Sequence, residues 1–398
     1  MGCMIMRIKI NENFNNIEES YLFSDINKRV NEYKSKNPNS DIIRLGIGDV
    51  TLPLPDIIVD AMINASKEML DKDTFRGYPP EYGYDFLKAA VKDYYKRNGT
   101  DIDLESIFIS DGAKSDLGNI VDILGDNDIY IPNPVYPVYL DSNLMSGRRI
   151  HFIVGSQENK FLPMPDGLDD EAKVIYLCSP NNPTGATYNY DELEKWVNYA
   201  KRTGSLIIFD SAYEAFIKDG SPRSIYQIPG AKEVAIEISS LSKMSGFTGV
   251  RCGFSIFPAE LVVGDKSLNR LWKRRQATKF NGVSYPVQRA AEAALSVEGV
   301  KACQKNLAIY HENAKLLCEL FDKKGIWYSG GKNSPYIWLK CPNNMKSFEF
   351  FQYLLEKANI VGTPGVGFGK YGEGYFRLTS FASKENTLKA IERLEKLL

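Results

Sequence analysis

Three apolar segments in this sequence are each followed closely by one chemically active side chain. The segments span residues 174–178, 205–210 and 234–238 and read as buried strands. The polar residues at or just beyond their ends are Asn182, Asp210 and Lys243, separated by 28 and 33 residues. Each interval fits about one strand–helix unit, so we expect a single wound α/β sheet. Such open sheets bind ligands at the carboxyl ends of their strands, which would place all three side chains at one edge.

The composition limits the classes of protein to which the chain can belong. With 398 residues, 43% of them hydrophobic, it is long enough for two domains with sizeable cores. A net charge of −1 gives no basic excess, so we expect no nucleic-acid partner. No apolar run approaches the roughly 20 residues of a membrane span, and residues 1–10 are too short and interrupted for a signal peptide. We therefore expect no membrane association.

Cysteine and histidine are too scattered to suggest a metal centre. The six cysteines have no paired short spacing, which favours reduced thiols in a cytoplasmic protein over a disulfide framework or a zinc site. The two histidines, His151 and His311, lie far apart in the sequence, which disfavours a histidine-based metal site or catalytic triad. We therefore expect no metal, and lysine has to carry more of the chemistry.

Lys243 stands among groups that can bind an anion. Ser240 and Ser242 can donate hydrogen bonds, Arg251 can form two at once, and the nearby glycines let the backbone approach a ligand. Neighbouring positive charge lowers the pKa of a lysine and frees the neutral amine, which is its nucleophilic form. Taken alone, the segment would read as a solvated loop with an ordinary surface lysine, so other parts of the sequence must supply the remaining groups.

Two charged side chains belong to otherwise apolar strands. A carboxylate at the end of a fully apolar strand, such as Asp210, is costly unless it meets a cation or a hydrogen-bond donor. Arg377 is the lone arginine of the apolar and aromatic segment 375–380, and a buried arginine needs an anion. We expect that anion to be a ligand's carboxylate; a structural salt bridge is the alternative.

Several turns are candidates for ligand contacts. Residues 107–116 read as strand, glycine turn and helix, an arrangement that binds phosphate through backbone N–H groups, and they lack the Walker lysine–threonine pattern. Gly48, at the end of the short strand and turn over 42–50, either brings backbone close to a ligand or is a plain turn glycine. Tyr78 and Tyr136 are further candidates for ligand contacts. The alternatives are that Tyr78 lies in an exposed aromatic turn and that Tyr136 is a core tyrosine packed beside proline.

The spacing of apolar residues also predicts the connecting helices. We expect helices over residues 21–36, 55–70, 84–97, 191–203, 258–280, 289–324 and 347–358, and a strand over 335–339. The predicted helix over 258–280 is basic, which we interpret as a solvated face or a dimer contact because the chain has no overall positive charge.

Together these motifs resemble those of the class I aminotransferases, pyridoxal-phosphate enzymes of fold type I. The shared motifs are Asn-Pro-Thr-Gly (182–185), Asp-x-x-Tyr (210–213), Ser-x-Ser-Lys (240–243) with Arg251, and the late Arg377. Further runs are similar to the LL-diaminopimelate aminotransferase branch: Leu-Gly-Ile-Gly-Asp-Val (45–50), Phe-Arg-Gly-Tyr (75–78), Asp-Gly-Ala-Lys (111–114), Pro-Val-Tyr-Pro-Val-Tyr (134–139) and Lys-Phe-Asn-Gly (279–282). The resemblance runs in order from about Tyr21 to Ser380.

The resemblance implies a fold and an assembly. The fold is α/β, of the pyridoxal-phosphate-dependent fold type I, with a large domain on a mostly parallel wound sheet and a smaller α/β domain. We expect residues 1–49 to form an N-terminal arm and part of the small domain, residues 50–288 the large cofactor-binding domain, and residues 289–398 the C-terminal small domain. The assembly implied is a homodimer with shared active sites.

The resemblance also implies how single residues act on pyridoxal 5′-phosphate. Lys243 would carry the cofactor and serve as general base, Asp210 would pair with its ring nitrogen, and Tyr213 would reach its phenolic oxygen. The other cofactor-binding residues implied are Ala113, Lys114, Tyr136, Asn182, Ser240, Ser242, Arg251, Tyr78 of the partner subunit and Asn281 of the partner subunit.

The implied substrates are an amino acid and a 2-oxo acid, here LL-2,6-diaminopimelate and 2-oxoglutarate. Arg377 would bind the α-carboxylate, and Glu81 of the partner subunit would pair with the far ammonium of diaminopimelate. The other substrate-binding residues implied are Gly48, Tyr136 and Asn182, with Tyr21, Lys114 and the partner's Asn281 at the far carboxylate.

Two alternatives remain open at this stage. The first is another class I enzyme, either an aspartate or aromatic aminotransferase or a β-eliminating lyase. The second is a non-catalytic cofactor-binding module attached to a DNA-binding domain. Only about 20 to 40 residues precede the expected core, and Lys243 and Arg377 are both present, which disfavours the second alternative. No arginine that could bind a side-chain carboxylate is evident over 279–288, which favours a substrate without a bare carboxylate at its far end.

Overall fold

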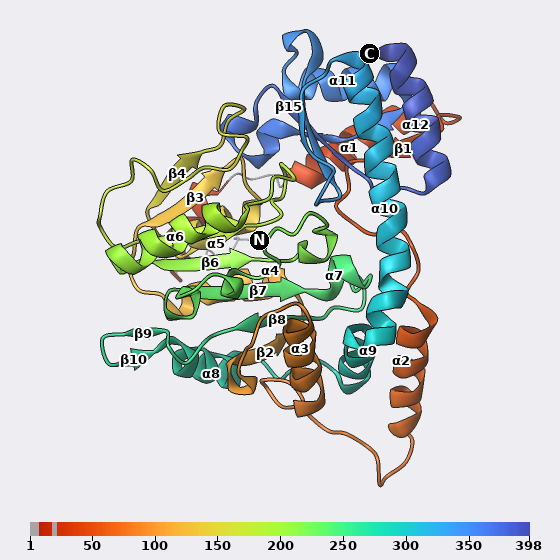
Figure 1. Ribbon diagram of the computed structural model, residues 1–398. Coiled ribbons are helices and arrows are strands. Elements are labelled where there is room, and N and C mark those ends of the chain that lie inside the picture. Colours follow the sequence, from red (N-terminus) through yellow and green to blue (C-terminus); the bar gives the residue numbers. More distant parts are fainter. Residues whose placement is uncertain (1–7, 18–21) are drawn as a thin grey trace, which may run out of the picture.

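A seven-stranded sheet forms the centre of the protein. The computed structural model describes residues 8–17 and 22–398. In spatial order the strands are β2 (Ile107–Ser110), β8 (Gly253–Ile256), β7 (Ala235–Ser240), β6 (Leu206–Asp210), β5 (Val174–Cys178), β3 (Ile129–Asn133) and β4 (Ile150–Val154) (Figure 1). Strands β3 to β7 are parallel, whereas β8 is antiparallel to both of its neighbours. The mostly parallel wound sheet expected from the sequence is confirmed.

The carboxyl ends of three adjacent strands meet at one edge of this sheet. Asp210, the last residue of β6, pairs in register with Cys178 of β5 and Ile238 of β7. Because these three strands are neighbours and parallel, the residues that follow them are brought together across the sheet. This adjacency is what the regular spacing of Asn182, Asp210 and Lys243 predicted.

A second, smaller sheet packs beside the first. Its antiparallel strands are β11 (Tyr328–Gly330), β12 (Tyr336–Lys340), β15 (Tyr375–Thr379) and β14 (Thr363–Pro364). A parallel pair, β1 (Ile43–Arg44) and β13 (Ile360–Val361), lies nearby, and the helices of this region are α1 (Leu22–Lys36), α11 (Ser347–Ala358) and α12 (Lys384–Leu397). One hydrophobic cluster joins Ile26 and Val30 of α1 with Phe351 of α11 and Leu394 of α12. The division into domains at residues 49/50 and 288/289 stays a prediction.

The remaining helices surround the large sheet or connect the two sheets. They are α2 (Asp56–Glu68), α3 (Asp85–Arg97), α4 (Ala113–Asn119), α5 (Pro137–Met145), α6 (Tyr190–Thr203), α7 (Leu241–Met244), α8 (Leu268–Lys279), α9 (Tyr285–Leu295) and α10 (Val297–Lys324). Helix α10 has 28 residues and runs from the neighbourhood of α2 and α9 to that of α12 (Figure 1). At 1.5 Å per residue it is roughly 42 Å long, so it contacts helices beside the large sheet as well as helices beside the small sheet.

Two predicted helices were wrong in their extent. Within 258–280 the structure places a hairpin of β9 (Val262–Val263) and β10 (Lys266–Ser267) before α8, because Gly264 takes a left-handed turn at φ +61°. The predicted single helix over 289–324 is two helices that meet at Ser296. The Ser296 side chain accepts a hydrogen bond from the Gly299 N–H at 2.9 Å and so starts a new helix, α10.

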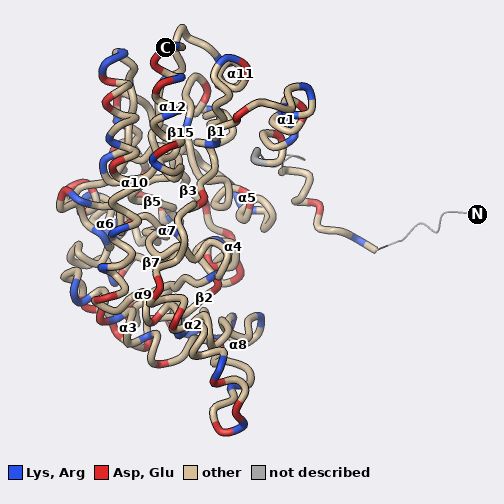
Figure 2. The backbone as a smooth tube through the Cα atoms, turned by 90° about the vertical axis from the view of Figure 1, so that its right-hand side faces the viewer, with Lys and Arg blue, Asp and Glu red and all other residues tan. Residues whose placement is uncertain are grey.

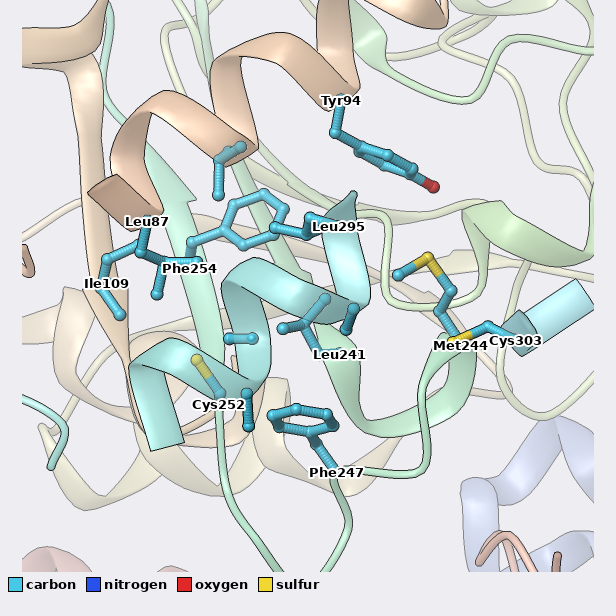
Figure 3. Close-up of a cluster of buried hydrophobic side chains, with 14 of the residues drawn as sticks. Leu87, Tyr94, Ile109, Leu241, Met244, Phe247, Cys252, Phe254, Leu295 and Cys303 are labelled. Carbon is cyan, nitrogen blue, oxygen red and sulfur yellow. The ribbon is translucent and has the colours of Figure 1, made fainter. Parts of the chain in front are cut away.

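A buried apolar cluster anchors the segment that carries Lys243. Leu241, Met244 and Phe247 are 2%, 6% and 0% exposed and pack with residues of α3, β2, β8 and α9 (Figure 3). Each such side chain stabilises its position by about 1.5–3 kcal/mol relative to exposure. These buried contacts hold the short helix α7 in place, so the backbone of Lys243, which lies between Leu241 and Met244, is fixed.

Basic and acidic residues alternate along the chain, as the blue and red stretches of the backbone in Figure 2 show. In the basic helix α8, Lys273 pairs with Glu105 at 2.7 Å, and Arg275 and Lys279 both reach Asp122 at 2.9 Å. These three basic side chains of α8 are therefore paired with acidic residues of the same chain. Within residues 8–17 and 22–398, no helix combines the length and apolarity that crossing a bilayer requires.

Candidate active site

Twelve of the predicted site residues line one cavity of about 380 Å³ between the two sheets. They are Gly48, Ala113, Lys114, Tyr136, Asn182, Asp210, Tyr213, Ser240, Ser242, Lys243, Arg251 and Arg377. The large sheet contributes the residues that follow its strands, and the small sheet contributes Arg377 from β15. Four basic and two acidic side chains line the cavity, so it favours anionic ligands.

Lys243 projects into this cavity from α7. The Ser240 hydroxyl caps that helical turn by accepting from the Ser242 N–H at 3.1 Å. The Lys243 ammonium donates to the carbonyl of Gly48. Burial lowers the pKa of Lys243 to about 8; Asp49 opposes this shift, and Arg377 and Arg251 add to it. Near neutral pH a useful fraction of the amine is therefore uncharged and nucleophilic.

Asp210 lies at the cavity end of β6 and is 5% exposed. Its Oδ2 accepts from the Tyr139 hydroxyl at 2.6 Å, and its Oδ1 accepts from the Ala212 N–H at 2.9 Å. Burial raises the pKa of Asp210, and these two hydrogen bonds oppose that rise. A cationic group in the cavity would favour the charged carboxylate further. Tyr139 follows Tyr136 by three residues in the Pro-Val-Tyr-Pro-Val-Tyr motif, but its side chain was not predicted to belong to the site.

Arg377 is 1% exposed and held by oxygens on three segments. It donates through Nη1 to Asn182 Oδ1 and through Nη2 to the carbonyl of Gly46, both at 2.7 Å, and its Nη2 is 3.4 Å from Thr363 Oγ1. These three acceptors are uncharged, and the hydrogen bonds to them fix the guanidinium in the cavity wall. A planar guanidinium held in this way can bind a carboxylate through two parallel hydrogen bonds.

Tyr213 has an unexpected partner in the cavity wall. Its hydroxyl oxygen lies 2.5 Å from that of Tyr336, on β12 of the small sheet. Tyr336 lies in a predicted strand, but no function was predicted for it. The other lining residues that the sequence did not predict are Ile47, Asp49, Leu117, Tyr139, Ala212 and Thr248.

One end of the cavity has the donor set of an anion site. Ser240, Ser242 and Arg251 lie there beside the backbone of Ala113, and the Arg251 guanidinium donates to the Thr248 carbonyl at 3.1 Å. A Cβ on Gly112 would stand 2.5 Å from Arg251 Nη2, so only glycine lets the strand–helix turn approach this cation. With Lys243 and the carboxylate of Asp210 in the same cavity, the residues fit a phosphate, an aldehyde and a basic ring nitrogen. Pyridoxal 5′-phosphate, the cofactor implied by the resemblance, combines these three groups.

Three predicted site residues do not line this cavity. Tyr78 is 89% exposed, and Glu81 and Asn281 also lie outside the lining. Their two loops adjoin each other, because a Cβ on Gly282 would lie 2.6 Å from the carbonyl oxygen of Pro80. A fourth predicted residue, Tyr21, lies outside the described residues. Across the described ranges, no three His, Cys, Asp or Glu side chains are grouped so that they could hold a metal ion.

The chain is similar to known proteins over almost its whole length. The family model for aminotransferase class I and II matches residues 40–394. An LL-diaminopimelate aminotransferase from Lachnospira eligens is 52% identical over 98% of this chain and 100% of that protein. One from Methanosphaera stadtmanae is 48% identical over the same shares. The solved structure of L,L-diaminopimelate aminotransferase from Chlamydomonas reinhardtii superposes with a TM-score of 0.92 at 38% identity, covering 98% of this chain and 99% of that one.

Proposed function

This chain belongs to the class I and II aminotransferases, which use pyridoxal 5′-phosphate, and we propose that it is an LL-diaminopimelate aminotransferase. The reaction moves an amino group between LL-2,6-diaminopimelate and 2-oxoglutarate; its products are tetrahydrodipicolinate, formed by ring closure with loss of water, and glutamate. In the biosynthetic direction glutamate donates the amino group. The observation that carries the proposal is the cavity that joins Lys243, Asp210 and Arg377. Relatives about half identical over their full length support the choice of substrate.

The residues of the cavity divide the work of amino-group transfer. Bound pyridoxal phosphate supplies an aldehyde for the amino group and a ring that takes up the electrons released at the substrate Cα. Lys243 would hold this cofactor and then, as a free amine, move a proton between the substrate Cα and the cofactor's C4′. The negative charge of Asp210 would keep the ring nitrogen protonated. Arg377 would orient the substrate by its α-carboxylate.

Other residues would fix the cofactor and the far end of the substrate. Tyr213 and Asn182 would face the phenolic oxygen, and Tyr136 would stack on the ring. The phosphate would be held by Ser240, Ser242, Arg251, the backbone of Ala113 and Tyr78 of the partner subunit. The far carboxylate of diaminopimelate would meet Lys114, Tyr21 and the partner's Asn281.

We propose that the active enzyme is a homodimer and acts in the cytoplasm. Tyr78, Glu81 and Asn281 lie outside this chain's own cavity, which supports a dimer in which they complete the active site of the second chain. The described cysteines, Cys178, Cys252, Cys303, Cys318 and Cys341, are free thiols, which suits a reducing compartment.

The function is tested by a transaminase assay of the purified protein. With 2-oxoglutarate as acceptor, LL-diaminopimelate should yield glutamate at a rate far above that of aspartate or aromatic amino acids. The meso stereoisomer is assayed beside it to define the stereochemistry accepted. Preferred use of aspartate or an aromatic donor would replace the proposal with another aminotransferase, and release of pyruvate from an amino acid would indicate a β-eliminating lyase.

Replacing Glu81 by glutamine should raise KM for diaminopimelate about 10-fold or more and leave KM for glutamate unchanged. The reason is that only diaminopimelate has a far ammonium, and a hydrogen bond to a charged group contributes about 1.5–3 kcal/mol. Steady-state kinetics with each amino donor measure the two constants. Glu298→Gln, an exposed acid at the start of α10, is the control. Equal changes for both donors would reject the role assigned to Glu81.

A further inference from the structure

Tyr336 places a second phenol against Tyr213 in the active site. The two hydroxyl oxygens are 2.5 Å apart, and the rings meet at 66° with centroids 5.0 Å apart. Both side chains are buried, and both line the cavity that contains Lys243. Tyr213 follows β6 of the large sheet, whereas Tyr336 begins β12 of the small one. The contact is therefore a direct hydrogen bond between the two sheets at the reacting centre.

The position of the Tyr336 hydroxyl is fixed by its surroundings. Its backbone pairs with Thr379 of β15, and its carbonyl accepts from the Gly331 N–H at 2.8 Å. A Cβ on Gly48 would lie only 2.7 Å from the Tyr336 hydroxyl oxygen, so this segment packs closely against the phenol. The carbonyl of Gly48 in turn accepts from Lys243. The hydroxyl thus has little freedom to leave Tyr213.

The position of Arg377 favours Tyr336 as the donor of this hydrogen bond. Its guanidinium carbon lies 4.5 Å from the centre of the Tyr336 ring. Burial raises the pKa of both tyrosines, and Arg377 opposes the rise in both. In Tyr336 this opposition is the strongest after burial, whereas in Tyr213 the neighbouring Tyr336 adds to the rise. A nearby cation makes a phenol the better hydrogen-bond donor. Two hydroxyls this close share one hydrogen, so donation by Tyr336 leaves the hydrogen of Tyr213 to point elsewhere.

We propose that Tyr336 is a positioning residue, which donates to Tyr213 and directs the Tyr213 hydrogen toward the phenolic oxygen of the bound cofactor. The inference rests on the proposed function, under which Tyr213 faces this oxygen. Because β12 pairs with β15, where Trp338 is opposite Arg377, the same small sheet supplies both the substrate's arginine and the donor to Tyr213. The position of that sheet therefore affects both the charge on the cofactor's phenolic oxygen and the orientation of the substrate.

Tyr336→Phe in the holoenzyme tests this proposal. The variant keeps the ring over Arg377 and loses only the hydroxyl; the charged side chains of the cavity, Asp49, Lys114, Asp210, Lys243, Arg251 and Arg377, are unchanged. We expect kcat to fall about 10-fold, as for loss of one hydrogen bond, with KM for glutamate within about 2-fold. The bound cofactor's absorption changes with pH, and the midpoint of this change should rise by about half a pH unit. The reason is that a weaker donor leaves more negative charge on the phenolic oxygen, so the proton next to that oxygen is lost only at a higher pH.

A double-mutant cycle separates positioning from a structural effect. In a Tyr213→Phe background, Tyr336→Phe should cause no further shift of the midpoint, because it acts through the missing hydroxyl. The control is Tyr188→Phe, which removes another buried hydroxyl, bonded to the Pro163 carbonyl at 2.7 Å outside the cavity, and should leave the midpoint unchanged.

Three outcomes would overturn the proposal. They are an unchanged midpoint in Tyr336→Phe, the same shift in the Tyr213→Phe background, or a raised KM with unchanged kcat, which would place the effect on Arg377. The proposed function is tested separately, on the wild-type protein: if that protein fails to bind pyridoxal phosphate or to transaminate, the function fails before any variant is compared.

Discussion

Lys243→Ala should lower kcat for diaminopimelate transamination by at least about 10⁴-fold. Proton transfer by a positioned side chain contributes about 10²–10⁴-fold, and loss of the covalent attachment adds to that. The expectation rests on geometry, because Lys243 lies in the cavity with Asp210 and Arg377 and its amine is already easier to deprotonate than that of a solvated lysine. Rates are measured with saturating pyridoxal phosphate and both substrates.

Two controls make this result specific. Lys266→Ala removes an exposed lysine of the β9–β10 hairpin and should leave kcat within about 2-fold. Borohydride treatment of the loaded wild-type enzyme, followed by peptide mapping, should then find the cofactor on Lys243. Recovery of the label on Lys114, the other lysine of the cavity wall, would show that the wrong amine was assigned.

Asp210→Asn should lower kcat by about 10³-fold. Asparagine keeps the shape, and its oxygen can still accept from the Ala212 N–H, so the backbone of this segment is preserved. What is lost is the negative charge, and an opposite charge at contact distance shifts a pKa by about 1–3 units, at 1.36 kcal/mol per unit. Without it the ring nitrogen loses its proton, and the ring takes up electrons less well.

The same variant should also bind pyridoxal phosphate more weakly, which equilibrium dialysis measures independently of turnover. Asp122→Asn is a matched control, since Asp122 pairs with Arg275 and Lys279 outside the cavity. It should change kcat by less than about 3-fold. Near-normal turnover of Asp210→Asn would mean that some other group protonates the ring.

The sequence predicted those site residues that depend on the order of strands. Asn182, Asp210 and Lys243 follow strands that proved to be parallel neighbours, so spacing alone placed them at one edge. Arg377 was found because a charge within an apolar strand is costly and needs a reason. In each case one local feature of the chain carried the information.

The sequence could not predict contacts made by packing of distant segments. Tyr336 occurs among apolar and aromatic residues, where a tyrosine reads as core, and its hydroxyl meets Tyr213 across 123 residues of sequence. Tyr139 likewise reaches Asp210, and Asp49 the neighbourhood of Lys243, only when α5 and the segment after β1 approach the sheet edge. The two helix errors had local causes, the turn at Gly264 and the cap at Ser296, that apolar spacing does not register.

The hydrophobic cluster shared by α1 and α12 determines when this protein can finish folding. Ile26 and Val30 belong to a segment that leaves the ribosome early, yet they pack with Phe351 and Leu394 near the end of the chain. The parallel pairing of β1 with β13 has the same requirement. The α1 segment therefore packs fully only after α11 and α12 have been synthesised, while the central sheet, whose strands precede them in the sequence, can assemble beforehand. The small sheet that carries Arg377 and Tyr336 therefore gains its full packing only after α12 has been synthesised.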